Sequence, residues 1–288
     1  MNNLLLVGGS GFVGQALRRH YQQLGWTVYT LGRRQDDDFA LDSIDSLQPT
    51  IQFQRLILAA AVNETQIQQD LQLSYQVNVV LTRQVVELCR RSKISELVYF
   101  STFHVYGRSS GELDELSPVA PKNDYGLTHY LSERIVLDLA SYASYKPLIL
   151  RPTNIYGLPS QLSDFHRWSL VPFEFVQSAV LKGKIEIRSS GQQLRNFVSI
   201  DDVVRSTELV GQVKVLNVFG LDTLSIVEFA RMVAKVLPDL HCQISTVPDS
   251  QPSPATTLVV RSCYPPYQPQ GDLADFIRQF AQMVLSHG

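Results

Sequence analysis

Short apolar runs alternate with longer amphipathic segments over the first half of the chain. The apolar runs have strand length and cover residues 4–7, 28–31, 56–60, 97–101 and 148–150. Between them, residues 12–24, 71–91 and 125–144 carry apolar side chains at helical spacing. Apolar strands that alternate with helices are typical of a parallel sheet covered on both faces. The pattern therefore predicts an α/β fold, a doubly wound parallel sheet of the Rossmann type.

The pattern becomes less regular after residue 151, where Pro and Gly are frequent and the predicted strands 185–187 and 197–200 are short. We predict a dinucleotide-binding Rossmann domain at 1–150 and a smaller C-terminal substrate-binding lobe at 151–288. The strand 215–218 and the helix 225–237 either return to the main sheet or build the lobe. Residues 248–269 are rich in Pro, Ser and Tyr and are predicted to be irregular, before a last helix over 273–285.

Three glycines at three-residue spacing, Gly8, Gly11 and Gly14, directly follow the first strand and open the first helix. Such glycines permit a tight turn, a close backbone approach to a pyrophosphate, and close packing of helix on strand. The free N–H groups of the helix N-terminus favour the anion. An ordinary glycine-rich turn is the alternative. The dinucleotide contacts predicted in this turn are Gly8, Ser10, Gly11, Phe12, Val13 and Gly14.

The end of the second strand bears on the choice between NADP and NAD. NAD-specific sites usually place Asp or Glu there to hold the ribose 2′-hydroxyl, whereas this chain has Gly32 followed by Arg33 and Arg34. Guanidinium groups bind phosphate through bidentate hydrogen bonds, so the two arginines favour the 2′-phosphate of NADP. The alternative is a pair of solvated arginines, partly neutralised by the acidic run at 36–38. NADP is the predicted cofactor, and NAD is the less favoured one.

Composition and charge exclude several classes of function. Of the 288 residues 44% are hydrophobic and 18% charged, and the net charge of −2 indicates neither a nucleic-acid nor a membrane-surface protein. The apolar run at 56–62 is too short to span a bilayer. The three cysteines and the histidines lack metal-ligand spacing, so no metal site is predicted. We expect a cytoplasmic protein.

Further motifs follow the glycine turn in a fixed order. They are Ala59-Ala60-Ala61, Asn78, Ser101-Thr102, Val105-Tyr106-Gly107, Tyr125-Gly126, Arg151-Pro152-Thr153-Asn154, Arg195-Asn196-Phe197-Val198, Asp201-Asp202-Val203 and Asn217. Together with the glycines, from residue 4 to about residue 237, they resemble the extended short-chain dehydrogenase/reductase family. This family comprises nucleotide-sugar epimerases, dehydratases and 4-keto reductases.

The resemblance assigns roles to individual residues. Tyr125 corresponds to the general acid/base, Thr102 to the residue that hydrogen-bonds the reacting oxygen, and His129 to the position that contacts the nicotinamide ribose. Further cofactor contacts are implied at Asp42, Ala59, Ala60, Ala61, Asn78, Tyr125, His129 and Pro152. Substrate contacts are implied at Thr102, Phe103, His104, Asn154 and Arg195.

His129 is also the main departure from the family, which has Lys four residues after the Tyr. A Lys cation favours the phenolate of a Tyr whose pKa is ordinarily near 10, whereas a His is mostly uncharged at neutral pH. Three interpretations follow: an enzyme that uses His129 instead of Lys, an enzyme that relies on other groups, or a nucleotide-binding protein without turnover. The Tyr142 and Lys146 pair has the same spacing but spans a predicted helix end, so it is not favoured.

The resemblance thus predicts an NADP(H)-dependent oxidoreductase or epimerase that acts on a nucleotide-activated sugar or a related carbonyl or hydroxyl compound. Phe103 and His104 stand where the dehydratases of the family have an acidic pair, which argues against 4,6-dehydration. A regulatory nucleotide-binding protein of the same fold is the alternative. By analogy we also expect a homodimer, formed through the helices at 71–91 and 125–144.

Overall fold

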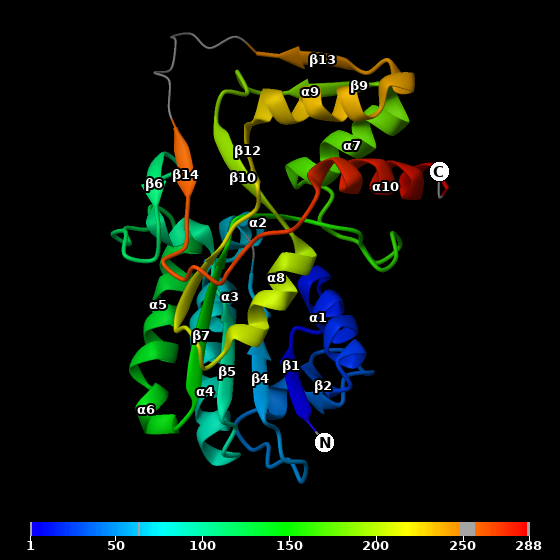
Figure 1. The fold of residues 1–288 in the computed structure, drawn as a ribbon. Helices are drawn as coiled ribbons and strands as arrows, with labels where there is room; N and C mark the ends of the chain where they lie inside the picture. Colours follow the sequence, from blue (N-terminus) through cyan, green and yellow to red (C-terminus); the bar gives the residue numbers. More distant parts are fainter. Residues whose placement is uncertain (1, 63, 248–256, 287–288) are drawn as a thin grey trace.

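The computed structural model describes residues 2–62, 64–247 and 257–286. Its centre is a parallel sheet of seven strands in the order β3-β2-β1-β4-β5-β7-β11 (Figure 1). The strands are β1 Asn3–Val7, β2 Thr27–Gly32, β3 Phe39–Ala40, β4 Arg55–Leu58, β5 Glu96–Phe100, β7 Lys146–Pro152 and β11 Val215–Val218. Because the order runs outwards from β1 in both directions, the sheet is doubly wound, and the predicted fold class is confirmed.

Helices cover both faces of this sheet. On one face α1, Phe12–Gln23, and α8, Ile200–Ser206, pack on Leu4, Leu6 and Ile57. On the other face α4, Leu81–Arg91, and α5, Asp124–Asp138, pack on side chains that alternate with the first set, such as Leu5 and Leu56. Successive strand residues point to opposite faces, and both faces are apolar, which explains the continuous apolar runs of the sequence.

Two of the predicted helices are divided in the structure. Residues 71–91 form α3, Leu71–Tyr75, then a π-helical turn, Gln76–Val80, then α4; α2, Glu64–Gln69, precedes them. The wide turn lies where the Asn78 carbonyl accepts hydroxyl hydrogen bonds from Thr82 at 2.7 Å and Ser132 at 2.5 Å. Residues 125–144 form α5 and α6, Ala140–Ala143, which ends at Ser144 in the left-handed region.

A second group of elements lies beyond the carboxyl ends of the main strands (Figure 1). Its core is aromatic and includes Phe173, Phe229 and Phe280. Its helices are α7 Val171–Lys182, α9 Ile226–Val236 and α10 Leu273–Leu285. Its strands are β8 Asn154–Tyr156, β10 Leu194–Ser199 and β12 Asp222–Ser225 in one sheet, and β9 Lys184–Ile187 with β13 Gln243–Thr246 in another. Short 3₁₀ turns are η1 Leu41–Ser43, η3 Phe103–Tyr106, η4 Thr207–Leu209 and η5 Pro238–Leu240.

Local patterns misplaced two segments. The strand predicted at 197–200 ends at Ser199, whose side chain caps α8, so Ile200 is helical. The segment predicted to be irregular, 248–269, contains β14, Leu258–Val260, which pairs in parallel with β6, Gly111–Leu113. Its first part, 248–256, lies outside the described residues. A three-residue strand has no periodicity of its own, and only its distant partner defines it.

Within the described ranges, every helix is too short or too polar to cross a lipid bilayer. In the same ranges, no three His, Cys, Asp or Glu side chains come close enough together to hold a metal ion.

Candidate active site

The turn between β1 and α1 has no room for side chains at two of the three regularly spaced glycines, Gly8 and Gly14. Gly8 has a φ of +89°, and a Cβ there would lie 2.7 Å from the Ala60 nitrogen; a Cβ on Gly14 would collide with the Gly8 carbonyl oxygen. At Gly11 a Cβ would meet only that oxygen, at 3.6 Å, so the space beside Gly11 is otherwise open. No side chain caps the N-terminus of α1. An open backbone surface with uncapped helical N–H groups fits a pyrophosphate.

The end of β2 carries charges of both signs. Arg33 and Arg34 are exposed. The Asp37 carboxylate accepts a hydrogen bond from the Arg34 N–H at 2.9 Å and occupies the place where a side chain at Gly32 would begin. Asp38 is held by the Thr30 N–H at 2.7 Å. The loop therefore brings one carboxylate of the acidic run at 36–38, that of Asp37, directly against the strand end at Gly32.

The other predicted cofactor residues lie along the same edge or near it. Ala59, Ala60 and Ala61 follow β4, where the Ala59 N–H donates to Val7 at 2.9 Å, and Pro152 ends β7. Asp42 is exposed in η1. Asn78 is 2% exposed, and its side chain bridges the Val62 N–H at 2.8 Å and the Thr128 hydroxyl at 3.0 Å. Asn78 therefore links the end of β4 to α5.

Thr102, His104, Tyr125 and His129 form one cluster at the carboxyl end of β5. Thr102 is buried, and its hydroxyl caps η3 by accepting the His104 N–H at 3.3 Å. The Tyr125 ring makes edge-to-face contacts with His129, at 4.8 Å between centroids, and with His104, at 5.4 Å. A Cβ on the neighbouring Gly126 would lie 2.7 Å from the His104 carbonyl oxygen, so η3 packs directly on the start of α5.

His129 is a neutral, buried side chain. It is 1% exposed, its Nδ1 is 2.8 Å from the Tyr99 hydroxyl, and its Nε2 is buried without a hydrogen-bond partner. Burial, with a smaller contribution from the nearby charge of His104, lowers the pKa of His129 to about 3. His129 therefore cannot replace the permanent positive charge of a Lys. Its unpartnered Nε2 keeps the capacity for one further hydrogen bond.

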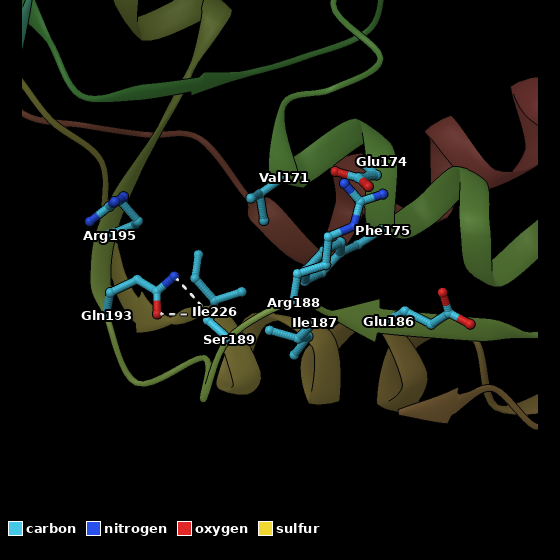
Figure 2. Close-up of a pocket in the computed structure, with 10 residues that line it drawn as sticks. All are labelled: Val171, Glu174, Phe175, Glu186, Ile187, Arg188, Ser189, Gln193, Arg195 and Ile226. Carbon is cyan, nitrogen blue, oxygen red and sulfur yellow. Dashed lines mark hydrogen bonds between the residues drawn. The ribbon is translucent and has the colours of Figure 1, made fainter. Parts of the chain in front are cut away.

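The predicted substrate residues lie in η3 and in the second group of elements. Phe103 packs against Tyr106 at 5.2 Å between ring centroids. Asn154 donates from Nδ2 to the Asn196 carbonyl at 2.9 Å. Arg195 lines a cavity of about 340 Å³ between α7, β9 and β10 (Figure 2). The cavity is lined by Val171, Glu174, Phe175, Glu186, Ile187, Arg188, Ser189, Gln193, Arg195 and Ile226.

Comparison with known proteins places this arrangement in a family. The family model described as the NAD dependent epimerase/dehydratase family matches residues 4–218. The chain belongs to this family. A relative, an uncharacterized UDP-glucose epimerase, YtcB of Bacillus subtilis, is 26% identical over 166 residues, which are 55% of this chain and 50% of the relative. The chain thus matches about half the length of this curated relative.

Two solved structures of the same fold span nearly all of this NAD dependent epimerase/dehydratase family member. One is MoeE5 in complex with UDP-glucuronic acid and NAD, with a TM-score of 0.80, 22% identity and 100% of each chain covered. The other is RMD from Pseudomonas aeruginosa complexed with NADPH, with a TM-score of 0.81, 19% identity and 100% of each chain covered. Because both structures are less than 25% identical to this chain, the comparison shows a shared fold alone.

Sequence reasoning missed the buried polar network behind the cluster in this family member. Glu133 accepts hydrogen bonds from the Ser101 hydroxyl at 2.5 Å and from Arg151 at 2.6 and 2.9 Å. Arg151 also donates to the Tyr106 hydroxyl at 2.9 Å, which donates to Asn217 at 2.7 Å. The spacing of Glu133, one helical turn after His129, could have indicated it. The network ties α5 to β5, β7 and β11 below the cluster.

Proposed function

We propose that this family member is an NADP(H)-dependent oxidoreductase or epimerase acting on a nucleotide-activated sugar, with Tyr125 as its acid/base. One observation carries the proposal. Tyr125 lies in one packed cluster with Thr102 and His129, at the same sheet edge as the glycine turn. Ligands of doubly wound sheets bind at this edge, so a hydroxyl donor and a dinucleotide would share one site.

A bound nicotinamide cofactor would supply or accept the hydride. The turn from Gly8 to Gly14 and the N-terminus of α1 would hold its pyrophosphate, and the Nε2 of His129 would meet a ribose hydroxyl. Thr102 and Tyr125 would hydrogen-bond the substrate oxygen, and Tyr125 would give it a proton or take one.

We propose NADP(H) as the preferred cofactor because Arg33 and Arg34 directly follow β2. Asp37 opposes this preference, since its carboxylate would repel a 2′-phosphate. The test compares the Kd of NADPH and NADH in wild type, the R33A/R34A double variant and D37N. We expect R33A/R34A to weaken NADPH about tenfold or more with little change for NADH, and D37N to strengthen NADPH. Equal effects on both cofactors would overturn the preference.

The cavity around Arg195 supports a nucleotide diphosphate as part of the substrate. Arg195 and Arg188 both line it, and guanidinium groups suit phosphate oxygens. MoeE5, of the same fold, binds UDP-glucuronic acid. Glu174 and Glu186 line the same cavity, so the charge that a diphosphate meets is mixed rather than purely positive.

The deciding experiment is Tyr125→Phe, with Tyr142→Phe as the matched control. Tyr142 is 54% exposed on α6. NADPH and NADH are titrated by nicotinamide fluorescence, and turnover is sought with a panel of UDP-, GDP- and dTDP-sugars and their keto forms. We expect turnover that Y125F lowers at least 100-fold, while NADPH binding and the Y142F variant stay near wild type.

A second candidate function, nucleotide binding without turnover, is favoured by the neutral, buried His129. It predicts that every sugar fails as a substrate and that Y125F changes ligand binding alone. Cofactor oxidation with any one sugar, abolished in Y125F, would exclude it.

We also propose a homodimer, as expected from the resemblance. Large apolar side chains are exposed on the two helical segments that the analogy names, and they are Leu71, Leu73, Val80, Leu127 and Leu131. Sedimentation analysis of wild type and L131D tests the proposal, with a dimer expected for wild type and a monomer for the variant. A monomeric wild type at micromolar concentration would overturn it. The cytoplasmic location stays a prediction.

A further inference from the structure

Two histidines contact the ring of Tyr125, and their surroundings differ. His129 is buried and neutral, whereas His104 is exposed on η3. Both rings meet Tyr125 at an interplanar angle of 77°. Since an imidazole can bind a proton, the contact with His104 can be neutral or positively charged.

The backbone of His104 is held firmly for an exposed residue. Its N–H bonds to the Thr102 hydroxyl, and its carbonyl lies against Gly126, where a Cβ would come within 2.7 Å. η3 then closes at Gly107, which has a φ of +65° and leaves no room for a side chain beside the Ala120 carbonyl. The position of His104 relative to Tyr125 therefore depends on packed backbone rather than on a mobile loop.

Several other charged or titratable groups lie around the cluster, and most of them are paired with residues other than Tyr125. Tyr99 of β5 bonds to His129, Glu133 of α5 is paired with Arg151 of β7, and Asp124 accepts a hydrogen bond from Tyr75 of α3 at 3.0 Å. The side chain of Lys122 lies against Gly107.

We propose that His104 is the titratable cation that tunes Tyr125, in the role for which this chain lacks a Lys at position 129. This proposal rests on the proposed function and adds that the reaction runs towards carbonyl reduction. A bound nicotinamide cofactor would supply the hydride to a carbonyl carbon. In that reaction the O–H bond of Tyr125 would break and a new O–H bond would form on the substrate oxygen. The electron pair stays on the phenolate, which protonated His104 stabilises, and water then returns the proton to Tyr125.

This arrangement favours carbonyl reduction at acidic to neutral pH. As pH rises through the titration of His104, the positive charge disappears and Tyr125 becomes a weaker acid. We therefore expect kcat for reduction of a keto-sugar to fall about five- to tenfold as His104 loses its proton with rising pH, without a matching change in KM.

The kinetic test compares four variants. His104→Gln should give a low, flat profile, and His104→Lys should restore the rate and keep it at high pH because its charge is permanent. His129→Gln should retain the falling limb. His241→Asn is the matched control, since His241 is exposed and has a φ of +46° that Asn tolerates. A falling limb that survives in His104→Gln would overturn the proposal.

A second measurement does not depend on turnover. Protein without cofactor is labelled at the Tyr Cζ carbons and the His rings, Tyr125 is assigned with Y125F, and both are followed by NMR against pH. We expect the Tyr125 signal to shift with the midpoint of His104, and this shift to be lost in His104→Gln but kept in His129→Gln. If the Tyr125 signal does not change while His104 titrates, the proposal is overturned, whether or not a substrate has been found.

Discussion

The glycine turn and the Tyr125 cluster lie at the same sheet edge but follow their family pattern to different degrees. At the turn, crowding against Ala60 and against the Gly8 carbonyl excludes side chains at Gly8 and Gly14, so the pattern has a direct steric cause. At the cluster, Thr102, Tyr125 and Gly126 pack together, and position 129, where the resemblance leads us to expect a Lys, holds a buried and neutral His. Steric fit thus explains the expected residues of the turn, whereas the cluster departs from expectation in its charge.

The largest effect is expected from breaking the buried ion pair between Glu133 and Arg151, which lies next to the cluster. Glu133→Ala leaves Arg151 buried without its carboxylate, so the free energy of unfolding should fall by about 3–5 kcal/mol. Urea denaturation measures it. Glu87→Ala, which breaks ion pairs on an exposed helix face, is the control and should change stability far less. Equal losses would mean that the buried pair does not hold the cluster.

The next prediction compares Gly14, where packing within the protein excludes a side chain, with Gly11, which lies beside open space. Gly14→Ala forces a Cβ into the Gly8 carbonyl, so we expect stability to fall by about 1–3 kcal/mol and dinucleotide affinity by about 100-fold. Gly11→Ala has room within the protein and should cost less than about 1 kcal/mol, yet still weaken the dinucleotide. Urea denaturation and calorimetric titration give both numbers. Unchanged binding in Gly11→Ala would contradict a close approach of the pyrophosphate.

A smaller effect concerns the neutrality of His129. The pKa of His129 is about 3 in the folded protein and near 6.5 in the unfolded chain. Above pH 6.5 the ring is neutral in both states and its full contribution to stability is present. As pH falls from 6.5 towards 3, only the unfolded chain binds the proton, so the free energy of unfolding falls. Between pH 6.5 and pH 5 this amounts to about 2 kcal/mol, at roughly 1.4 kcal/mol per pH unit. Urea denaturation should show this loss in wild type and in His241→Asn, but a flatter dependence in His129→Gln. A loss of the same size in His129→Gln would assign it to other groups.

The smallest effect restores the family's charge. His129→Lys puts a permanent cation beside Tyr125, so turnover at neutral pH should rise about three- to tenfold and its dependence on the titration of His104 should weaken. The pH profile of kcat is the measurement, with His129→Gln as the uncharged control. The same rise in His129→Gln would show that charge is not the cause.

The elements of the sheet were predictable because each is encoded locally. The runs 4–7, 28–31, 56–60 and 97–101 lie in β1, β2, β4 and β5 or extend one or two residues past them, and the helix after the glycine turn begins at Phe12 as predicted. Apolar periodicity reports burial of one element at a time, and this was enough to derive the fold class.

Pairing between distant segments was not predictable in this way. β14 is defined by β6, far earlier in the chain, and β11 becomes a strand of the main sheet only through its contact with β7. The sequence predicted a strand at 215–218 but left its sheet open, and the three residues of β14 are too few to carry a periodicity, so only the assembled structure decided both pairings.

By itself, the sequence determined the doubly wound fold, the glycine turn and the family motifs, because steric demands and apolar periodicity act over a few neighbouring residues. Only the tertiary structure decided the electrostatics. It brought the Asp37 carboxylate against Gly32, paired Glu133 with Arg151, and buried His129 while it left His104 exposed. The physical reason is that the charge of a side chain depends on its solvation and on charged neighbours that the chain brings close only when it folds.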